Sequence, residues 1–229
     1  NWKLGFRFAW LGELTRVPAQ ERPLGFQDWV RPESPLRRET LGWLGRTLAR
    51  RLGYRHVLED LPNYTVLENR LFSPRRLRDG TVVQTFVRCG DFERATFSDL
   101  AWLLAPTFLD ALERTAGISI LFLHWGKHPG RLFADLDPGG VRALEALSHR
   151  AREKRIWVTT TGRLLAYAEA HRFLRFGTKE GEGRLTILLQ ADPLPDGRVL
   201  TPADLAGISF RVPDPEKTAI EWNGAPVPA

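Results

Sequence analysis

The sequence predicts an α/β protein built from βα units, followed by a small all-β structure. Helical and extended apolar patterns alternate between residues 41 and 173, which is typical of strands and helices on a parallel sheet or barrel. Residues 118–123 are apolar at five of six positions, as expected of a strand buried on both faces. From residue 184 onward, short extended runs separated by turn residues replace the helical pattern.

The composition narrows the class of protein. A chain of 229 residues is long enough for one large domain, or for one domain with an appendage. No run approaches about eighteen apolar residues, so we expect no transmembrane helix, and no basic-then-apolar signal segment begins the sequence. A mature secreted protein would also lack that signal, so the compartment stays open. The single cysteine, Cys89, excludes an internal disulfide and a multi-cysteine metal site.

The net charge of +6 comes mostly from arginine, which forms two dense groups. A basic patch can attract nucleic acid, anionic glycans or acidic lipid. Arginine at helical spacing more often forms a solvated face, and no nucleic-acid recognition motif accompanies these residues. We therefore expect solvated faces, and nucleic-acid binding stays a third, weaker alternative that rests on charge alone. The arginines are Arg37, Arg38, Arg46, Arg50, Arg51 and Arg55, then Arg70, Arg75, Arg76 and Arg78.

The amino-terminal part of the sequence predicts an irregular segment followed by a helix. Residues 1–33 form the irregular entry, with a short strand at 4–10. Pro35 begins a helix that ends at Gly53, because Pro is favoured in the first turn and Gly just past the last. Leucines spaced three and four apart give this helix one apolar stripe. They are Leu41, Leu44, Leu48 and Leu52.

Strands and helices then alternate. Residues 54–58 indicate a strand, and Asp79-Gly80 predicts a hairpin turn before the alternating run 81–87. Pro106 should divide the helical stretch that follows. The apolar run 118–123 is the expected central parallel strand.

The last helices and the tail complete the prediction. Asp137 should cap one helix and Thr161 the next, with a strand at 156–160 between them. We expect residues 1–175 to form the α/β domain and residues 176–229 a carboxyl-terminal β appendage. Its expected parts are a Gly-rich connection at 177–183, strands at 185–189, 208–212 and 219–222, and a turn at 223–224.

Polar residues at strand ends are the candidates for function. His124 and Trp125 follow the central strand, and ligands of α/β folds bind beyond the carboxyl ends of parallel strands. His124 could transfer a proton, or hydrogen-bond a neighbour in the core. Trp125 could offer its face to a sugar ring or close the end of a barrel. Arg88 and Asp91 could line the same cleft or form an ion pair, and Asp60 could orient a histidine or cap a turn.

Several of these segments together resemble the later half of a known domain. They are Leu52-Gly53-Tyr54 with its strand, the Asp-Gly hairpin, Leu121-Phe122-Leu123-His124, and the run 156–160 with the Leu-rich helix that holds Tyr167. Over residues 34–175 the chain resembles a polysaccharide deacetylase domain, a distorted β/α barrel that removes acetyl groups from sugar polymers with a divalent metal. The resemblance implies a carbohydrate polymer as substrate and a place outside the cell or in its envelope.

The resemblance also implies roles for two residues. His124 ends a Leu-x-His motif whose histidine is the family's catalytic acid, and Asp60 lies in an acidic cluster that orients a catalytic group. The chain departs from the family at the metal, which is bound there by an Asp-Asp pair and a His-x-x-x-His motif. His124 and His128 are four apart, but Gly126 disfavours a helix between them. Either a divalent metal such as zinc is held by a preceding part of a longer enzyme, or this is a barrel without a metal site that binds a glycan or a partner.

Overall fold

The structure is a computed structural model with a mixed α/β fold. Contacts divide the chain into two compact units, the first made of Asn1–Arg75 with Gln84–Val158 and the second of Arg76–Val83 with Thr159–Ala229. The described residues contain several sheets but no closed barrel, so the distorted or partial barrel stays a prediction, as do the domain limits. The described residues are 7–15, 17–24, 26, 41, 44–45, 47–49, 51–53, 69–90, 96–124, 137–181, 183–205 and 207–227.

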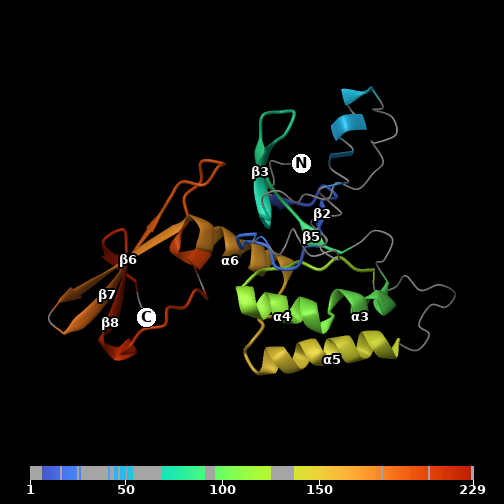
Figure 1. Ribbon diagram of the computed structural model, residues 1–229. Coiled ribbons are helices and arrows are strands. Elements are labelled where there is room, and N and C mark those ends of the chain that lie inside the picture. The colour runs from blue at the N-terminus through green and yellow to red at the C-terminus, as the bar shows by residue number, and fades with distance from the viewer. Residues whose placement is uncertain are drawn as a thin grey trace. The chain divides into compact units, whose positions relative to one another are not determined.

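Two small sheets with parallel strand pairs are formed mostly by residues of the first unit (Figure 1). In one sheet β4 (Val82–Phe86) lies between β1 (Phe8–Ala9) and β3 (Phe72–Arg76), and β1 is parallel to β4. In the other, β2 (Leu14–Thr15) pairs in parallel with β5 (Arg88–Cys89). Parallel pairing requires crossover connections, which agrees with the predicted α/β class.

The predicted turn between β3 and β4 is confirmed. Gly80 has a φ of +86°, a conformation that glycine adopts without steric cost. The Leu77 amide donates to the Thr81 carbonyl at 2.8 Å, and the Thr81 amide donates to the Asp79 carboxylate at 3.0 Å. The hydrogen bond from the Thr81 amide lowers the pKa of Asp79.

Residues 118–122 are extended but do not form the regular central strand that the sequence predicts. Ile118 makes one antiparallel bridge to Gln20, and Leu121 makes one parallel bridge to Cys89. The Cys89 amide donates to the Ile120 carbonyl at 2.6 Å, and the Phe122 amide donates to the Cys89 carbonyl at 2.9 Å. The predicted parallel pairing is therefore confirmed at Leu121 by a single bridge. The prediction of a regular strand over residues 118–123 is wrong.

The backbone on either side of Gln20 explains the interruption. Ala19 and Glu21 both have a positive φ, of 65° and 63°, which turns the chain so that only Gln20 can pair with Ile118. The Ser119 side chain then takes over part of the pairing, because its oxygen accepts a hydrogen bond from the Ala19 amide at 3.2 Å.

The helices of the first unit begin where the sequence predicts. A 3-10 turn, η2 (Phe97–Asp99), leads into α3 (Leu100–Leu103), and α4 (Pro106–Thr115) begins at Pro106. Pro106 thus divides the helical stretch as predicted. The Asp137 carboxylate accepts a hydrogen bond from the Gly140 amide at 2.8 Å and caps α5 (Pro138–Arg152), which confirms that cap.

These helices enclose the larger core of the first unit. Helix α5 lies alongside α3 and α4 (Figure 1), and apolar side chains fill the space between them. The fully buried members are Phe97, Leu100, Leu104, Leu109 and Ala143. None of the helices in the described part of the chain has the length and apolarity needed to cross a membrane.

Replacing Gly140 by alanine should destabilise the first unit by about 1–3 kcal/mol, the usual cost of overpacking. A Cβ at Gly140 would lie 2.6 Å from the Phe97 ring and 2.7 Å from the Phe97 carbonyl oxygen. Gly162→Ala is the matched control, because it also adds a methyl group to a helix and no described atom lies within 4 Å of that position. Urea denaturation measures both. Equal destabilisation by the two variants would contradict the packing that we describe.

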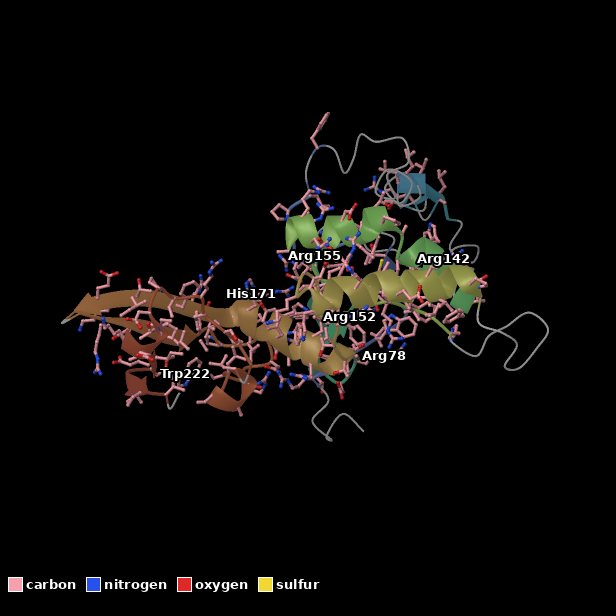
Figure 2. The ribbon with its side chains drawn as sticks, turned by 90° about the horizontal axis from the view of Figure 1, so that it is seen from below. Arg78, Arg142, Arg152, Arg155, His171 and Trp222 are labelled. Atoms are coloured by element: carbon pink, nitrogen blue, oxygen red, sulfur yellow. The ribbon has the colours of Figure 1, made fainter. Side chains whose placement is uncertain are left out.

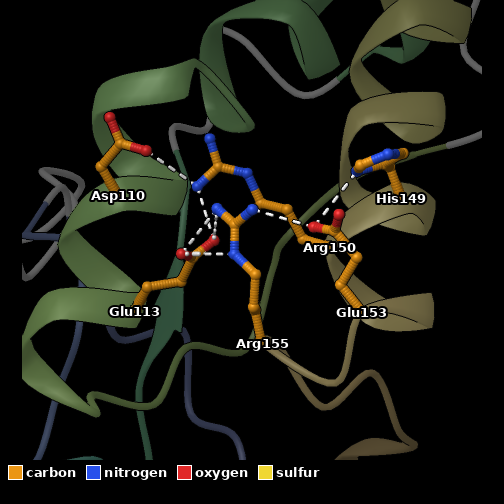
Figure 3. A network of polar contacts seen from close by, with 6 residues as sticks. All are labelled: Asp110, Glu113, His149, Arg150, Glu153 and Arg155. Atoms are coloured by element: carbon orange, nitrogen blue, oxygen red, sulfur yellow. Dashed lines mark hydrogen bonds and ion pairs between the residues drawn. The ribbon is translucent and has the colours of Figure 1, made fainter.

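Helices α4 and α5 are also joined by a network of charges (Figure 3). Glu113 of α4 accepts hydrogen bonds from Arg150 at 2.7 Å and from Arg155 at 2.8 Å. Arg150 also contacts Asp110 at 2.8 Å, and Arg155 contacts Glu153 at 2.9 Å. Each arginine thus bridges two carboxylates, so Glu113 is the point where both arginines meet.

This network should make the stability of the first unit depend on acid pH. Burial raises the pKa of Glu113, but the hydrogen bonds from Arg155 and Arg150 outweigh it and hold the pKa below its ordinary value. The stabilisation is therefore complete above the ordinary glutamate pKa of about 4.3 and is lost as the pH falls through the lowered pKa of the folded state.

We expect the denaturation midpoint of the wild-type protein to fall more steeply below about pH 4.3 than that of Glu113→Gln, which cannot titrate. Glu145→Gln, at an exposed position of α5, should keep the wild-type slope. Urea denaturation across the acid range measures all three proteins. Parallel pH profiles for wild type and Glu113→Gln would show that the network does not stabilise the fold.

The second unit consists of α6 and one sheet with the strand order β6-β7-β8-β9 (Figure 1). The sheet joins β6 (Leu174–Gly181) antiparallel to β7 (Arg184–Ala191), β8 (Thr218–Trp222) parallel to β7, and β9 (Ala225–Pro226) antiparallel to β8. The predicted strands at 185–189 and 219–222 and the turn at 223–224 are confirmed. Two 3-10 turns, η3 (Pro202–Leu205) and η4 (Pro215–Lys217), lie between β7 and β8.

Three details of the tail differ from the prediction. The expected Gly-rich connection at 177–183 belongs mostly to β6, because its residues pair with β7 and the turn begins only after Gly181. Residues 208–212 form no strand, since Ile208 turns back to hydrogen-bond the Leu205 carbonyl at 3.0 Å. Helix α6 (Thr161–Phe173) is capped by Thr160, one residue before the predicted cap.

The core of the second unit lies between α6 and the connection from β7 to β8. Ala170, Leu194 and Leu200 are its fully buried members, and Trp222 of β8 (labelled in Figure 2) packs against them. Glu169 is also buried, with 1% of its side chain exposed, and it accepts a hydrogen bond from Arg198 at 2.7 Å. This ion pair lets the carboxylate stay in the core without an unpaired charge.

The predicted strand at 156–160 is absent. The amides of Arg155 and Ile156 donate to the Arg150 carbonyl, at 3.0 and 3.4 Å, so the chain folds back on the end of α5. Trp157 and Val158 therefore have 52% and 56% of their surface exposed, although both are apolar residues of the run that predicted a strand. The apolar stripe Leu41, Leu44, Leu48 and Leu52 is likewise exposed, by 51–66%.

The predicted solvated arginine faces are confirmed where the structure describes them. Arg78 in the hairpin turn is exposed, and so are Arg142 and Arg152 on α5, which belong to neither predicted group (Figure 2). Arg51, Arg70, Arg75 and Arg76 are exposed as well. The remaining arginines of the two predicted groups, Arg37, Arg38, Arg46, Arg50 and Arg55, lie outside the described residues.

Candidate functional site

Two of the five predicted site residues lie in the described part of the chain. They are His124, which is exposed, and Arg88, which is half-buried. Asp60, Trp125 and Asp91 lie outside the described residues. The site is therefore built from the surroundings of His124 and Arg88.

His124 stands where the sequence places it, at the carboxyl end of the extended segment. Its ring meets the Phe122 ring edge-on, with centroids 5.0 Å apart and planes at 77°. This geometry is the favourable one for two aromatic rings, so Phe122 holds the imidazole from one side. Phe122 itself is buried, with 5% of its surface exposed, and gives the contact a fixed base.

Trp10 connects His124 and Arg88 through Phe122. The Trp10 ring lies 5.3 Å from the Phe122 ring, and the Arg88 guanidinium carbon lies 4.2 Å above the Trp10 ring. The Trp10 indole donates to the Glu13 carbonyl at 2.9 Å, which fixes its orientation. We call Trp10, Arg88, Phe122 and His124 the aromatic–arginine cluster.

The strand pairing explains why the cluster forms on one face. Cys89 and Leu121 are direct partners, so their side chains point to the same face. Side chains alternate along extended backbone, which sends Arg88 and Phe122 together to the opposite face. His124, two residues after Phe122, follows the same alternation, as its ring contact with Phe122 confirms.

Arg88 is the charged member of the cluster. Its guanidinium is 5.5 Å from the Phe86 ring as well as 4.2 Å from Trp10, and its Nε atom is buried without a hydrogen-bond partner. This burial lowers the pKa of Arg88, because a charged group is less stable away from water. The guanidinium nevertheless remains charged at any pH at which the protein would function.

The described side chains do not provide a metal site. Within the described ranges, no group of three or more His, Cys, Asp or Glu residues gathers closely enough to hold an ion. Zinc needs three or four such ligands. The divalent metal that the deacetylase resemblance implies therefore does not fit the described residues, and no step of catalysis is assigned to it here.

Sequence reasoning found His124 and Arg88 but missed Trp10 and Phe122. Aromatic residues in extended apolar runs are by default expected in the core, so neither stands out as a site residue. One signal was available for Trp10, because it is the last residue of the short strand predicted at 4–10. Its position beside Phe122, however, depends on contacts between segments more than a hundred residues apart.

Comparisons with family models, with curated proteins and with solved structures gave no match to this chain.

Proposed function

We propose that this protein is a glycan-directed hydrolase that removes acetyl groups from a sugar polymer, with His124 as general acid. The observation that supports the proposal is the exposed imidazole held against Phe122 at the carboxyl end of an extended segment. Such strand ends are where ligands bind in α/β folds. The resemblance to polysaccharide deacetylases, in which the corresponding histidine is the catalytic acid, supports the same role. A substrate of this kind lies outside the cell or in its envelope.

In this reaction His124 would donate one proton to the leaving group. Water adds to the acetyl carbonyl carbon, and the bond from that carbon to the sugar oxygen or nitrogen then breaks. The departing atom must take up a proton, which an imidazolium can donate at neutral pH. Trp10, which is half-buried and packs on Phe122, adds aromatic surface to the cluster, and aromatic surface of this kind suits the face of a sugar ring.

A non-catalytic barrel that binds a glycan or a partner is the second candidate. The composition of the aromatic–arginine cluster favours it, because the half-buried Trp10 ring and the Arg88 guanidinium can hold a ligand without any reaction. The two candidates share the binding surface and differ in turnover.

Acetate release distinguishes them. The intact protein is incubated, with zinc supplied, with N-acetylglucosamine oligomers and with acetylated xylan, and binding to the same glycans is followed by calorimetry. Acetate release above a heat-denatured control supports the hydrolase. Binding without release supports the second candidate, and neither binding nor release would contradict both.

A further inference from the structure

Arg88 differs in its surroundings from two other half-buried arginines, Arg150 and Arg198. Arg150 has 15% of its side chain exposed and contacts Asp110 and Glu113. Arg198 has 31% exposed and contacts Glu169 and Asp204. Both show the usual solution for a guanidinium withdrawn from water, which is a carboxylate partner.

Arg88 has aromatic rings where those residues have carboxylates. In the described part of the chain no carboxylate forms an ion pair with it, and its guanidinium lies instead over the rings of Trp10 and Phe86. The nearest candidate along the paired strands is Glu13, whose carbonyl accepts the Arg88 amide at 3.2 Å. The Glu13 carboxylate instead contacts Arg75 at 3.1 Å and the Leu11 amide at 3.1 Å.

This arrangement prepares a guanidinium for an external anion. Stacking on Trp10 restricts the planar group, so a ligand would bind it at a smaller loss of side-chain entropy. Its buried Nε has no hydrogen-bond acceptor, and among the described residues aromatic rings, not a carboxylate, meet the cation. Carboxylate and sulfate groups match the fork of arginine, since two parallel N–H groups can donate to two oxygens of either group.

We infer that Arg88 binds an oxyanion of the substrate, so that the protein prefers an anionic glycan, carrying carboxylate or sulfate groups, over a neutral one. The inference rests on the proposed function for the identity of the ligand as a glycan. The placement of the residues does not depend on whether the protein is an enzyme. Arg88, Phe122 and His124 share one face, and Trp10 touches both Arg88 and Phe122. A charged sugar unit held at Arg88 would place the neighbouring unit toward His124.

Three oligosaccharides of equal length test this preference by calorimetry with the intact protein. One alternates N-acetylglucosamine with glucuronate, one is sulfated oligo-N-acetylglucosamine, and one is neutral oligo-N-acetylglucosamine. We expect one or both anionic probes to bind about tenfold to a hundredfold more tightly than the neutral probe, as charge-assisted hydrogen bonds allow. The tighter of the two identifies the oxyanion. Equal affinity for all three would overturn the inference.

Variants show whether Arg88 carries the preference. Arg88→Gln should remove it, and Arg88→Lys should keep only part of it, because an ammonium group lacks the planar fork. Arg152→Gln is the matched control: it makes the same change in charge at an exposed position of α5 (Figure 2). An equal loss in Arg88→Gln and Arg152→Gln would mean that net charge alone attracts the probes, and would overturn the inference.

The failure of this inference can be told from the failure of the proposed function. His149→Ala, an exposed histidine variant outside the aromatic–arginine cluster, should bind the anionic probe as wild type does, whether or not the protein releases acetate. A preference for anionic glycans that depends on Arg88, found without acetate release, would support the anion site and contradict the proposed hydrolase. Acetate release without any preference for anionic glycans would support the proposed hydrolase and contradict the anion site. Circular dichroism confirms that Arg88→Lys, the conservative variant, is folded.

Discussion

Replacing Phe97 by alanine should destabilise the first unit by about 3–5 kcal/mol, the usual cost of removing a buried aromatic ring. Phe97 has 1% of its surface exposed and lies in the core with Leu100, Leu104 and Leu109. Its ring also lies against Gly140 of α5, so the cavity would open where η2, α3 and α5 meet. Urea denaturation followed by circular dichroism measures the change in the free energy of unfolding.

Phe26→Ala is the matched control for this prediction. Phe26 is 81% exposed, so the same truncation there removes little buried surface. We expect a change within about 0.5 kcal/mol, as for most surface substitutions. Similar losses for the two variants would contradict the placement of Phe97 at the centre of the core.

Replacing His124 by alanine should lower the turnover of an acetylated glycan by roughly 100-fold or more, the scale of general acid catalysis. The melting temperature should change little, because the side chain is exposed and its one contact within the described residues is with the Phe122 ring. Acetate release per folded molecule and thermal melting, measured on the same samples, test both parts.

His149→Ala provides the comparison for His124→Ala. His149 is an exposed histidine that contacts Glu153 at 3.3 Å on α5, outside the aromatic–arginine cluster. Its removal should leave turnover unchanged. A large drop in the melting temperature of His124→Ala, with turnover per folded molecule preserved, would show a structural histidine and end the catalytic assignment.

Sequence patterns predicted the elements whose signals are local. Pro106 and Asp137 mark helix starts because the first turn of a helix tolerates proline and needs an acceptor for its free amides. The Asp79-Gly80 turn is fixed by the φ of Gly80 and by a hydrogen bond two residues away. Each of these features depends on residues within one turn of the chain, so the sequence is sufficient to find it.

Strands were predicted less well because an apolar extended run becomes a strand only when a partner is available. Residues 156–160 have the pattern but fold back on α5, and residues 208–212 contribute Ile208 to a core without joining the sheet. The run 118–123 finds partners on two different segments and pairs only briefly with each. These outcomes depend on distant residues, which single-sequence patterns do not report.

The same distinction applies to the candidate site. His124 and Arg88 were identified from their positions at the ends of extended runs, which is a local property. The stacking of Arg88 on Trp10, and of Trp10 on Phe122, joins three segments that are far apart in the sequence. The sequence thus predicted which residues are chemically capable and did not predict which aromatic rings surround them.

The pairing of Cys89 with Leu121 also gives the protein a natural reporter. Cys89 is the chain's one thiol, is 2% exposed, and lies between Thr15 of β2 and the segment that ends in His124. A thiol reagent can reach it only when this pairing opens, so the labelling rate measures local opening rather than surface chemistry. Each labelling event therefore reports one opening of the pairing between Cys89 and Leu121, in the extended segment that positions the His124 imidazole.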